Sequence, residues 1–343
     1  MVELNGKKIL VTFLMHLGDL TLTTPFIHAL RKAAPDAHIT MLVDEKLKDV
    51  VLFNPYLDEV VTIDKKGRDN SILSLWACSR HLSKLDFDVL INLHPNERCS
   101  FIDAMTNVRL RTGTTHKIFK WFWDVFTPLD RSMHAADMYL DVLQQLGVQD
   151  LSNNGLEIFP GEEHFLEAEL FWQEQNITDQ DKLIGFNIGS AVPTKRWPPE
   201  RFAEVADIFA AKGYRTVFFG GPMDEEMVAE ATGYMQTRPI IATGHFAIGG
   251  LAAAMRRCCL IITNDSGPMH VAISQKVPIV AMYGPSNPKL YGPYTKDAVI
   301  VTAQPPCQGC ADGMKHSCDD LQCMSRMTVE QVVAAADTIM LNK

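Results

Sequence analysis

The sequence lacks any run of eighteen or more apolar residues without a charge, which is about the length that a membrane-spanning helix requires. Its amino terminus also lacks a basic segment followed by an uninterrupted apolar one, so we expect no signal peptide. A basic excess is missing as well, because the formal net charge of the 343 residues is −9. Binding along a nucleic-acid backbone needs a basic footprint, so we expect no nucleic-acid partner. Any membrane contact is expected to be peripheral.

Short β-branched and apolar runs alternate along the chain with longer stretches of helical spacing, which predicts right-handed βαβ units and parallel sheets. The pattern restarts after residues 147–181, a stretch with turn signals and a polar helix around Glu162–Gln175. We therefore expect an α/β chain with two Rossmann-like domains, residues 1–160 and 161–343, facing a central cleft. The expected strands are Ile9–Leu14, His38–Val43, Val60–Ile63, Val89–Leu93, Leu183–Ile188, Thr216–Phe219, Ile240–Thr243, Leu260–Thr263, Ile279–Tyr283 and Ala298–Thr302.

The first informative motif is His16-Leu17-Gly18-Asp19, directly after the first expected strand. Ligands of open parallel sheets bind at the carboxyl ends of the strands, so the Asp19 carboxylate is placed to act as a general base. The alternative is that Asp19 only sits near the start of the following helix, where the helix dipole favours it. No G-x-G-x-x-G follows this strand, which argues against a nicotinamide dehydrogenase.

Two further motifs follow expected strands of the second domain. After the first of these strands, Gly189 and Ser190 offer amides and a hydroxyl to a phosphate, and Lys195 offers a cation to a diphosphate leaving group. The alternative for this segment is a surface turn with solvated basic residues. Asp265-Ser266-Gly267 passes from a buried strand into a helix, which predicts an anion site at a helix amino terminus. His270 lies one turn into that helix and faces either the phosphates or the core.

A fourth candidate is Asp224, in the segment Gly220–Glu226 that follows the strand at Thr216–Phe219. An acidic side chain at this place can accept hydrogen bonds from ribose hydroxyls. It can equally cap the helix that begins with Glu225 and Glu226. Both interpretations remain open from the residues alone.

These motifs, in this order and at this spacing, resemble glycosyltransferase family nine, the ADP-heptose:lipopolysaccharide heptosyltransferases, over nearly the whole chain. The resemblance implies a GT-B architecture, an inverting mechanism, an ADP-sugar donor held mainly by the carboxy-terminal domain, an acceptor in the lipopolysaccharide inner core, and no cofactor required for catalysis. Ala191 stands where some members have a second hydroxyl, so that contact is missing. The resemblance implies a catalytic base at Asp19 and donor-binding residues at Ser190, Lys195, Asp224, Asp265, Ser266, Gly267 and His270.

The amino-terminal domain is then expected to bind an anionic glycolipid acceptor, and the chain to work in the cytoplasm at the inner face of the inner membrane. The stretch Lys117–Phe126 combines two lysines and an arrangement of five aromatic rings, which is typical either of an interfacial membrane contact or of a domain core. We expect the last helix either to stay in its own domain or to pack back on the amino-terminal one. The candidate acceptor-binding cations are Lys65, Arg68, Arg98 and Lys120.

Four cysteines near the end of the chain have spacing compatible with a structural zinc site of four thiolates. Reduced thiols and two disulfides are the alternatives, and a cytoplasmic enzyme disfavours disulfides. The other four cysteines are expected to be reduced thiols that serve as small core residues. The candidate zinc ligands are Cys307, Cys310, Cys318 and Cys323.

Two other functions remain compatible with the motifs. A nucleotide-sugar epimerase of GT-B architecture would use the same donor site and need no lipid acceptor. A non-catalytic protein that binds an ADP-sugar would consume no donor.

Overall fold

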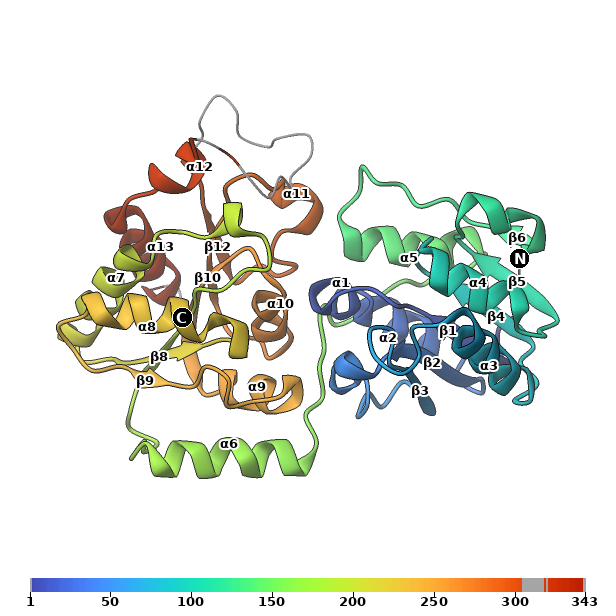
Figure 1. Ribbon diagram of the computed structural model, residues 1–343, viewed down its shortest axis with the longest axis horizontal. Helices are drawn as coiled ribbons and strands as arrows, with labels where there is room; N and C mark the ends of the chain where they lie inside the picture. Colours follow the sequence, from blue (N-terminus) through green and yellow to red (C-terminus); the bar gives the residue numbers. More distant parts are fainter. Residues whose placement is uncertain (1, 304–317, 319, 342–343) are drawn as a thin grey trace. The chain divides into compact units, whose positions relative to one another are not determined.

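The computed structural model describes residues 2–303, 318 and 320–341 (Figure 1). It divides into two compact units, Met1–Phe159 and Pro160–Lys343, and the boundary expected after residue 160 lies within one residue of this division. Each unit contains one six-stranded sheet with helices packed on it. All the strand pairs are parallel, as the alternation of strands and helices predicted.

The sheet of the first unit has the strand order β3-β2-β1-β4-β5-β6. The sequence predicted four of these strands and missed β5 and β6, because β5 includes the polar residues Arg111 and Thr112 and β6 has only two residues. The strands are β1 Lys8–Thr12, β2 His38–Asp44, β3 Glu59–Ile63, β4 Val89–Asn92, β5 Leu110–Gly113 and β6 Val125–Phe126. The helices are α1 Leu17–Thr21, α2 Thr24–Ala33, α3 Ile72–Ser83, α4 Glu97–Met105 and α5 Ala135–Gln145, with 3₁₀ turns η1 Glu45–Val50 and η2 Lys117–Phe122.

Helices α3 and α4 pack against each other and cover one face of this sheet. Each begins with a side-chain cap: the hydroxyl of Ser71 accepts a hydrogen bond from the amide of Ser74, and the amide oxygen of Asn96 accepts one from Cys99. Leu75 and Ile102 of these helices lie in one buried cluster with Leu10 of β1. The cluster fixes both helices on the sheet that contains β1, the strand that precedes the Asp19 motif.

The sheet of the second unit has the order β12-β11-β10-β7-β8-β9. All six strands were expected from the sequence. The strands are β7 Leu183–Asn187, β8 Arg215–Phe219, β9 Ile240–Ile241, β10 Cys258–Asn264, β11 Ile279–Met282 and β12 Ala298–Val301. The helices are α6 Glu162–Glu174, α7 Pro199–Ala211, α8 Glu225–Tyr234, α9 Ile248–Met255, α10 Gly267–Ser274, α11 Pro288–Tyr291, α12 Gln322–Ser325 and α13 Val329–Leu341, with 3₁₀ turns η3 Pro193–Lys195 and η4 Pro222–Asp224.

The last helix, α13, belongs to the core of the second unit. Val332 and Ala336 are fully buried there in the same cluster as Trp197 and strand residues of β7 and β10. The indole nitrogen of Trp197 donates to the carbonyl of Met327, 3.1 Å away, just before α13 begins. Helix α13 therefore contributes to the core of its own unit, and packing on the amino-terminal domain stays a prediction.

A buried carboxyl group ties together three elements of the first unit. Asp103 of α4 is fully buried, and its Oδ2 accepts hydrogen bonds from the Thr12 hydroxyl of β1 at 2.9 Å and the Asn92 amide of β4 at 2.6 Å. Burial raises the pKa of Asp103 to about 8, and the hydrogen bonds from Thr12 and Asn92 only partly oppose this. The carboxyl group therefore stays protonated in the folded protein at neutral pH.

This proton makes stability depend on pH. The folded protein keeps it up to about pH 8, whereas an unfolded aspartate releases it near pH 4. The contribution is therefore complete below about pH 4 and is lost as the pH rises through about 8. Between pH 6.5 and 8 we expect the free energy of unfolding to fall by about 2 kcal/mol through this group, at about 1.4 kcal/mol per pH unit.

Asp103→Asn should flatten this part of the profile, because the amide keeps an acceptor oxygen and has no such proton to lose. Urea unfolding at pH 6.5, 7.25 and 8 measures the difference between variant and parent. Asp179→Asn, an exposed position in the second unit, is the control and should follow the parent. An Asp103→Asn profile as steep as that of the parent would contradict a protonated Asp103.

Candidate active site

Asp19 lies in the first turn of α1, which follows β1 at the carboxyl edge of the first sheet. His16 precedes the helix in an extended conformation, and its Nδ1 lies 3.6 Å from Asp19 Oδ2. The Asp19 side chain keeps 26% of its surface exposed, so a ligand can reach the carboxylate. The sequence alternative placed Asp19 near the start of the helix that contains Pro25 to Lys32, but that helix is α2, and Asp19 lies in the separate short helix α1 before it. The geometry is compatible with a general base, and that role stays a prediction.

Lys65 anchors the loop that leads into α1. Its ammonium donates to the carbonyls of Leu14 at 3.0 Å and Met15 at 2.9 Å, and it pairs with Asp44 at 3.1 Å. Asn96 donates a further, longer bond of 3.4 Å to Leu14. These contacts fix the backbone immediately before the His16-to-Asp19 motif. The sequence analysis proposed Lys65 as a cation that binds the acceptor. It did not predict that Lys65 binds the carbonyls of Leu14 and Met15, because these residues are distant from it in the sequence.

The other three cations proposed for the acceptor have different surroundings. Arg98 donates to the carbonyl of Lys65 and to the side chain of Asn70, so it too supports the loop. Arg68 is exposed and pairs with Glu45 at 2.8 Å. Lys120 is exposed and lies 4.7 Å from the centre of the Phe126 ring. Acceptor binding by these residues stays a prediction.

His94 is a candidate that the sequence analysis missed. It follows β4, the neighbour of β1, and its ring meets Phe13 edge-on at 6.1 Å. Burial lowers the pKa of His94 to about 4, while Asp19 acts in the opposite direction and Arg131 and His16 act with burial. The imidazole is therefore neutral at neutral pH and lies within electrostatic range of Asp19. A single histidine has no motif, but its place after a strand paired with β1 was the available signal.

The second unit brings together the residues predicted to hold a phosphate. Lys195 Nζ lies 2.7 Å from Asp265 Oδ2, and both side chains are largely buried. The hydroxyl of Ser286 donates to the same carboxylate oxygen. Ser190 Oγ donates to the carbonyl of Asp265 at 3.4 Å, and this connects the ends of β7 and β10. Ser286 was not predicted, because it comes from the loop after β11.

Helix α10 begins directly after Asp265 and Ser266, and no side chain caps its first turn in the structure described. Ser266 is the N-cap residue, and its hydroxyl accepts a hydrogen bond from Asn187 at 2.8 Å. Pro268 has no N–H, and the Met269 amide donates to the Ser266 carbonyl at 3.2 Å. The Gly267 amide is therefore the helix-start donor that can serve an anion, together with the ammonium of Lys195. His270 lies one turn further along and is buried. The predicted loop Asp265-Ser266-Gly267 is therefore assembled, and its phosphate role stays a prediction.

Two residues outside the predicted set hold the Ser190 loop in place. Arg196 donates through Nε at 2.9 Å and Nη2 at 2.7 Å to the carbonyl of Ser190. The side chain of Asn264 accepts a hydrogen bond from the backbone amide of Trp197 at 3.0 Å and donates one to the carbonyl of Ile188 at 2.7 Å. The backbone that carries Ser190 is therefore held from both sides.

Asp224 folds back on the backbone instead of projecting freely. Its Oδ2 accepts the amide of Gly221 at 2.9 Å, and only 8% of the residue is exposed. A Cβ on Gly189 would lie 2.2 Å from Asp224 Oδ1, so only glycine fits beside this carboxylate. Asp224 stands at the N-cap position of α8, but its side chain makes no capping hydrogen bond to that helix and instead closes the upstream turn η4. The predicted cap on the helix that begins with Glu225 is therefore wrong, and ribose binding stays a prediction.

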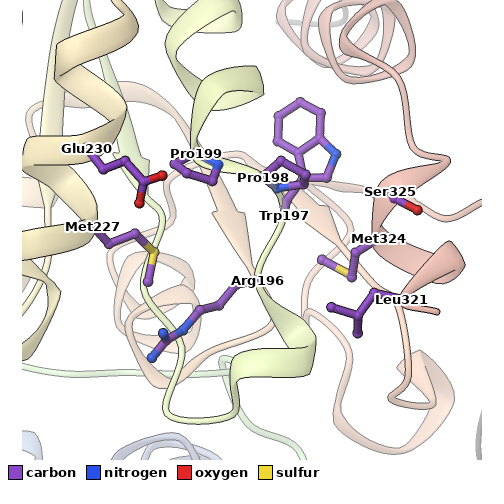
Figure 2. A pocket seen from close by; sticks show the side chains of 9 residues that line it. All are labelled: Arg196, Trp197, Pro198, Pro199, Met227, Glu230, Leu321, Met324 and Ser325. Carbon is purple, nitrogen blue, oxygen red and sulfur yellow. The ribbon is translucent and has the colours of Figure 1, made fainter. Parts of the chain in front are cut away.

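A separate pocket of about 360 Å³ lies beside the segment that follows Lys195 (Figure 2). Side chains from α8 and α12 face residues 196–199 across it. None of the predicted donor residues lines it. The lining residues are Arg196, Trp197, Pro198, Pro199, Met227, Glu230, Leu321, Met324 and Ser325.

The cysteine expectations have mixed outcomes. Cys99 and Cys258 are buried free thiols, as expected for small core residues, whereas Cys259 is an exposed free thiol. Cys307 and Cys310 lie outside the described residues, so the structural zinc stays a prediction. Within the residues that the structure describes, no helix has the length and hydropathy needed to cross a membrane.

Comparison with known proteins identifies the family. The model of glycosyltransferase family 9 (heptosyltransferase) matches residues 75–318. Lipopolysaccharide heptosyltransferase 3 of Escherichia coli (strain K12) is 24% identical over 297 residues, which are 82% of this chain and 84% of that protein. A crystal structure of a family 9 glycosyl transferase from Veillonella parvula DSM 2008 is 53% identical, with a TM-score of 0.95 over 100% of this chain and 99% of that one.

The structure of E. coli ADP-heptose lps heptosyltransferase II is 21% identical and has a TM-score of 0.81 over 98% of this chain and 99% of that chain. These likenesses confirm the expected GT-B architecture. They also favour glycosyl transfer over the epimerase and the non-catalytic binding protein. Since the family model spans most of the chain, the chain belongs to glycosyltransferase family 9 and is a glycosyltransferase.

Proposed function

We propose that this glycosyltransferase transfers heptose from ADP-heptose, with inversion, to the inner core of lipopolysaccharide. The observation that carries the proposal is the Lys195–Asp265 pair at the start of α10 in a chain of this family. The names of its relatives support the sugar and the acceptor: one is a lipopolysaccharide heptosyltransferase and another an ADP-heptose lps heptosyltransferase.

The donor half of the reaction is assigned to the second unit. The diphosphate binds at the start of α10, where the Gly267 amide, the ammonium of Lys195 and the hydroxyls of Ser190 and Ser266 supply donors. Charge develops on the diphosphate as the bond to the anomeric carbon breaks, so these fixed donors stabilise the leaving group in the transition state. Asp224 is the proposed partner of the ribose hydroxyls.

The acceptor half is assigned to the first unit. The Asp19 carboxylate takes the proton of an acceptor hydroxyl, and the hydroxyl oxygen attacks the anomeric carbon on the face opposite the diphosphate. The new glycosidic bond forms as the bond to ADP breaks, and ADP leaves with the electron pair. Neutral His94 can exchange hydrogen bonds with the sugar without adding a charge beside Asp19.

The acceptor of such a reaction is an anionic glycolipid, so we propose that the protein acts peripherally at the cytoplasmic face of the inner membrane. Lys65, Arg68, Arg98 and Lys120 remain the proposed acceptor cations. Arg68 and Lys120 are the more accessible pair, because Lys65 and Arg98 are engaged by the chain itself.

Mass spectrometry of the purified protein incubated with ADP-heptose and truncated core glycolipids tests the proposal. A product heavier by one heptose, together with release of ADP, is expected. Isomerised ADP-sugar without transfer would indicate an epimerase. No donor consumption with any acceptor would indicate a binding protein.

Asp19→Asn should lower kcat by about a hundredfold to ten-thousandfold, because a positioned general base contributes about that much to rate. ADP affinity should stay near that of the parent, since the base acts on the acceptor. Steady-state kinetics and calorimetry with ADP measure the two effects. Glu162→Gln is a matched control, because it removes a first-turn carboxylate from α6 and should leave kcat unchanged. Activity of Asp19→Asn within about threefold of the parent would remove Asp19 from the mechanism.

Lys195→Ala should weaken ADP binding by about tenfold to a hundredfold, because hydrogen bonds to charged groups contribute about 1.5–3 kcal/mol. It should also slow transfer, since the diphosphate is charged in the ground state and in the transition state. Calorimetry with ADP measures the affinity, and thermal unfolding checks that the variant folds. Lys212→Ala breaks an exposed pair with Asp337 in the same unit and serves as the control. Unchanged ADP binding by folded Lys195→Ala would place the phosphate site elsewhere.

A further inference from the structure

The most exposed large apolar side chains of the first unit lie on α3 and η2. Trp121 of η2 is 95% exposed and Leu73 of α3 is 78% exposed. Singly exposed apolar residues are common on soluble proteins, but several on neighbouring elements mark an interaction surface. We call this set the apolar edge patch. Its members are Ile72, Leu73 and Trp76 of α3 and Ile118, Trp121 and Phe122 of η2.

These exposed rings overturn part of one expectation from the sequence. If the stretch Lys117–Phe126 were simply domain core, its rings would be buried, and Trp121 and Phe122 are not. The two flanking rings are held: Phe119 packs edge-on with Phe101 at 6.2 Å, and the indole of Trp123 donates to the carbonyl of Thr112. The anchored rings fix η2 so that its remaining apolar side chains face solvent.

The two parts of the patch lie near the active-site edge of the same unit. Helix α3 follows β3 and η2 follows β5, so both begin at the carboxyl edge of the sheet, where the Asp19 motif follows β1. Both also contact α4, which lies beside α3 in Figure 1. Arg98, near the start of α4, supports the Lys65 loop. Helix α4 therefore links both parts of the patch to Lys65, whose ammonium holds the backbone before the Asp19 motif.

Charge on these elements has one sign. The segments 72–84 and 117–122 contain Arg80, Lys84, Lys117 and Lys120 and no acidic residue, in a protein whose net charge is −9. All four cations are exposed. Aromatic rings can enter the boundary between headgroups and acyl chains of a bilayer, and basic side chains beside them can bind anionic headgroups.

We propose that the apolar edge patch is the surface by which this protein docks on an anionic membrane. The inference rests on the proposed function, in which the acceptor is lipid-linked. Trp121, Phe122 and Leu73 enter the headgroup boundary, while Lys117 and Lys120, in the same turn as Trp121, meet anionic headgroups. Docking in this way brings the carboxyl edge of the sheet, with Asp19, to the layer that holds the acceptor.

A second copy of the chain fits this surface less well. A symmetric contact between two copies pairs the same patch with itself, so it would bring the cations of one copy against those of the other. Like charges brought together at an interface oppose association. An anionic membrane is the partner that satisfies both the rings and the cations.

Co-sedimentation with vesicles tests the docking surface. The parent should bind vesicles of phosphatidylglycerol and phosphatidylcholine, and more weakly vesicles of phosphatidylcholine alone. Ile118→Ser with Trp121→Ser, and separately Leu73→Ser with Trp76→Ser, should each weaken binding by about tenfold or more, as expected when large apolar groups leave a buried site. Lys117→Glu with Lys120→Glu should weaken binding only to the anionic vesicles, by about fivefold or more for each lysine, with loss of the salt dependence.

Leu166→Ser with Leu170→Ser on α6 is the matched control, because it removes two exposed apolar side chains from the second unit and should leave vesicle binding unchanged. Thermal unfolding confirms that each variant folds. Patch variants that fold and bind anionic vesicles like the parent would overturn the proposal. So would a parent that binds neither vesicle, or patch variants that turn a dimer into a monomer without changing vesicle binding.

Transfer assays separate this inference from the proposed function. The Ile118 and Trp121 variant should transfer heptose to a deacylated, water-soluble acceptor like the parent and to the same acceptor embedded in vesicles more slowly. Equal rates for variant and parent on the embedded acceptor would overturn the docking surface alone. A parent that transfers to neither acceptor would overturn the proposed function, whatever the vesicle binding shows.

Discussion

Parallel pairing of the strands is the constraint on which both half-sites depend. The strands of each sheet run in one direction and have helices packed on them, so their side chains are mostly buried and unavailable to a ligand. Polar chemistry can appear only where the chain leaves the sheet, and in a parallel sheet all carboxyl ends lie at one edge. Asp19 and His94 follow β1 and β4, and Ser190 and Asp265 follow β7 and β10. These strands are direct neighbours in their sheets.

The loops at these edges are held by hydrogen bonds that the sheet itself cannot supply. Lys65 fixes the carbonyls before α1, and Arg196 with Asn264 fixes the loop that carries Ser190. Below the first of these loops, the protonated Asp103 joins β1 to β4. The side chains proposed to do chemistry thus depend on a layer of buried polar groups beneath them. Burying such groups is favourable only when their hydrogen bonds are made.

The sequence predicted the fold and the residue types of the site better than it predicted their partners. Alternating strands and helices indicated both sheets, but β5 and β6 escaped because they are short and Arg111 interrupts the apolar pattern. Lys195 and Asp265 were found because each follows a strand, whereas their ion pair joins residues distant in the sequence. The sequence also did not reveal that Trp121 is exposed, because segments of the same composition occur in domain cores. Only packing separates Phe119, which meets Phe101, from Trp121, which meets solvent.

The pairing of Lys195 with Asp265 bears on how an empty donor site behaves. A buried ammonium without a counter-charge costs several kcal/mol, so a site that relied on its ligand for neutrality would resist emptying. Here Asp265 lies 2.7 Å away, and its carboxylate also accepts a hydrogen bond from the Ser286 hydroxyl. In the proposed reaction, Lys195 passes from the departing ADP to a carboxylate that is already in place. Product release then leaves no unpaired ammonium in the empty site, because Lys195 returns to Asp265.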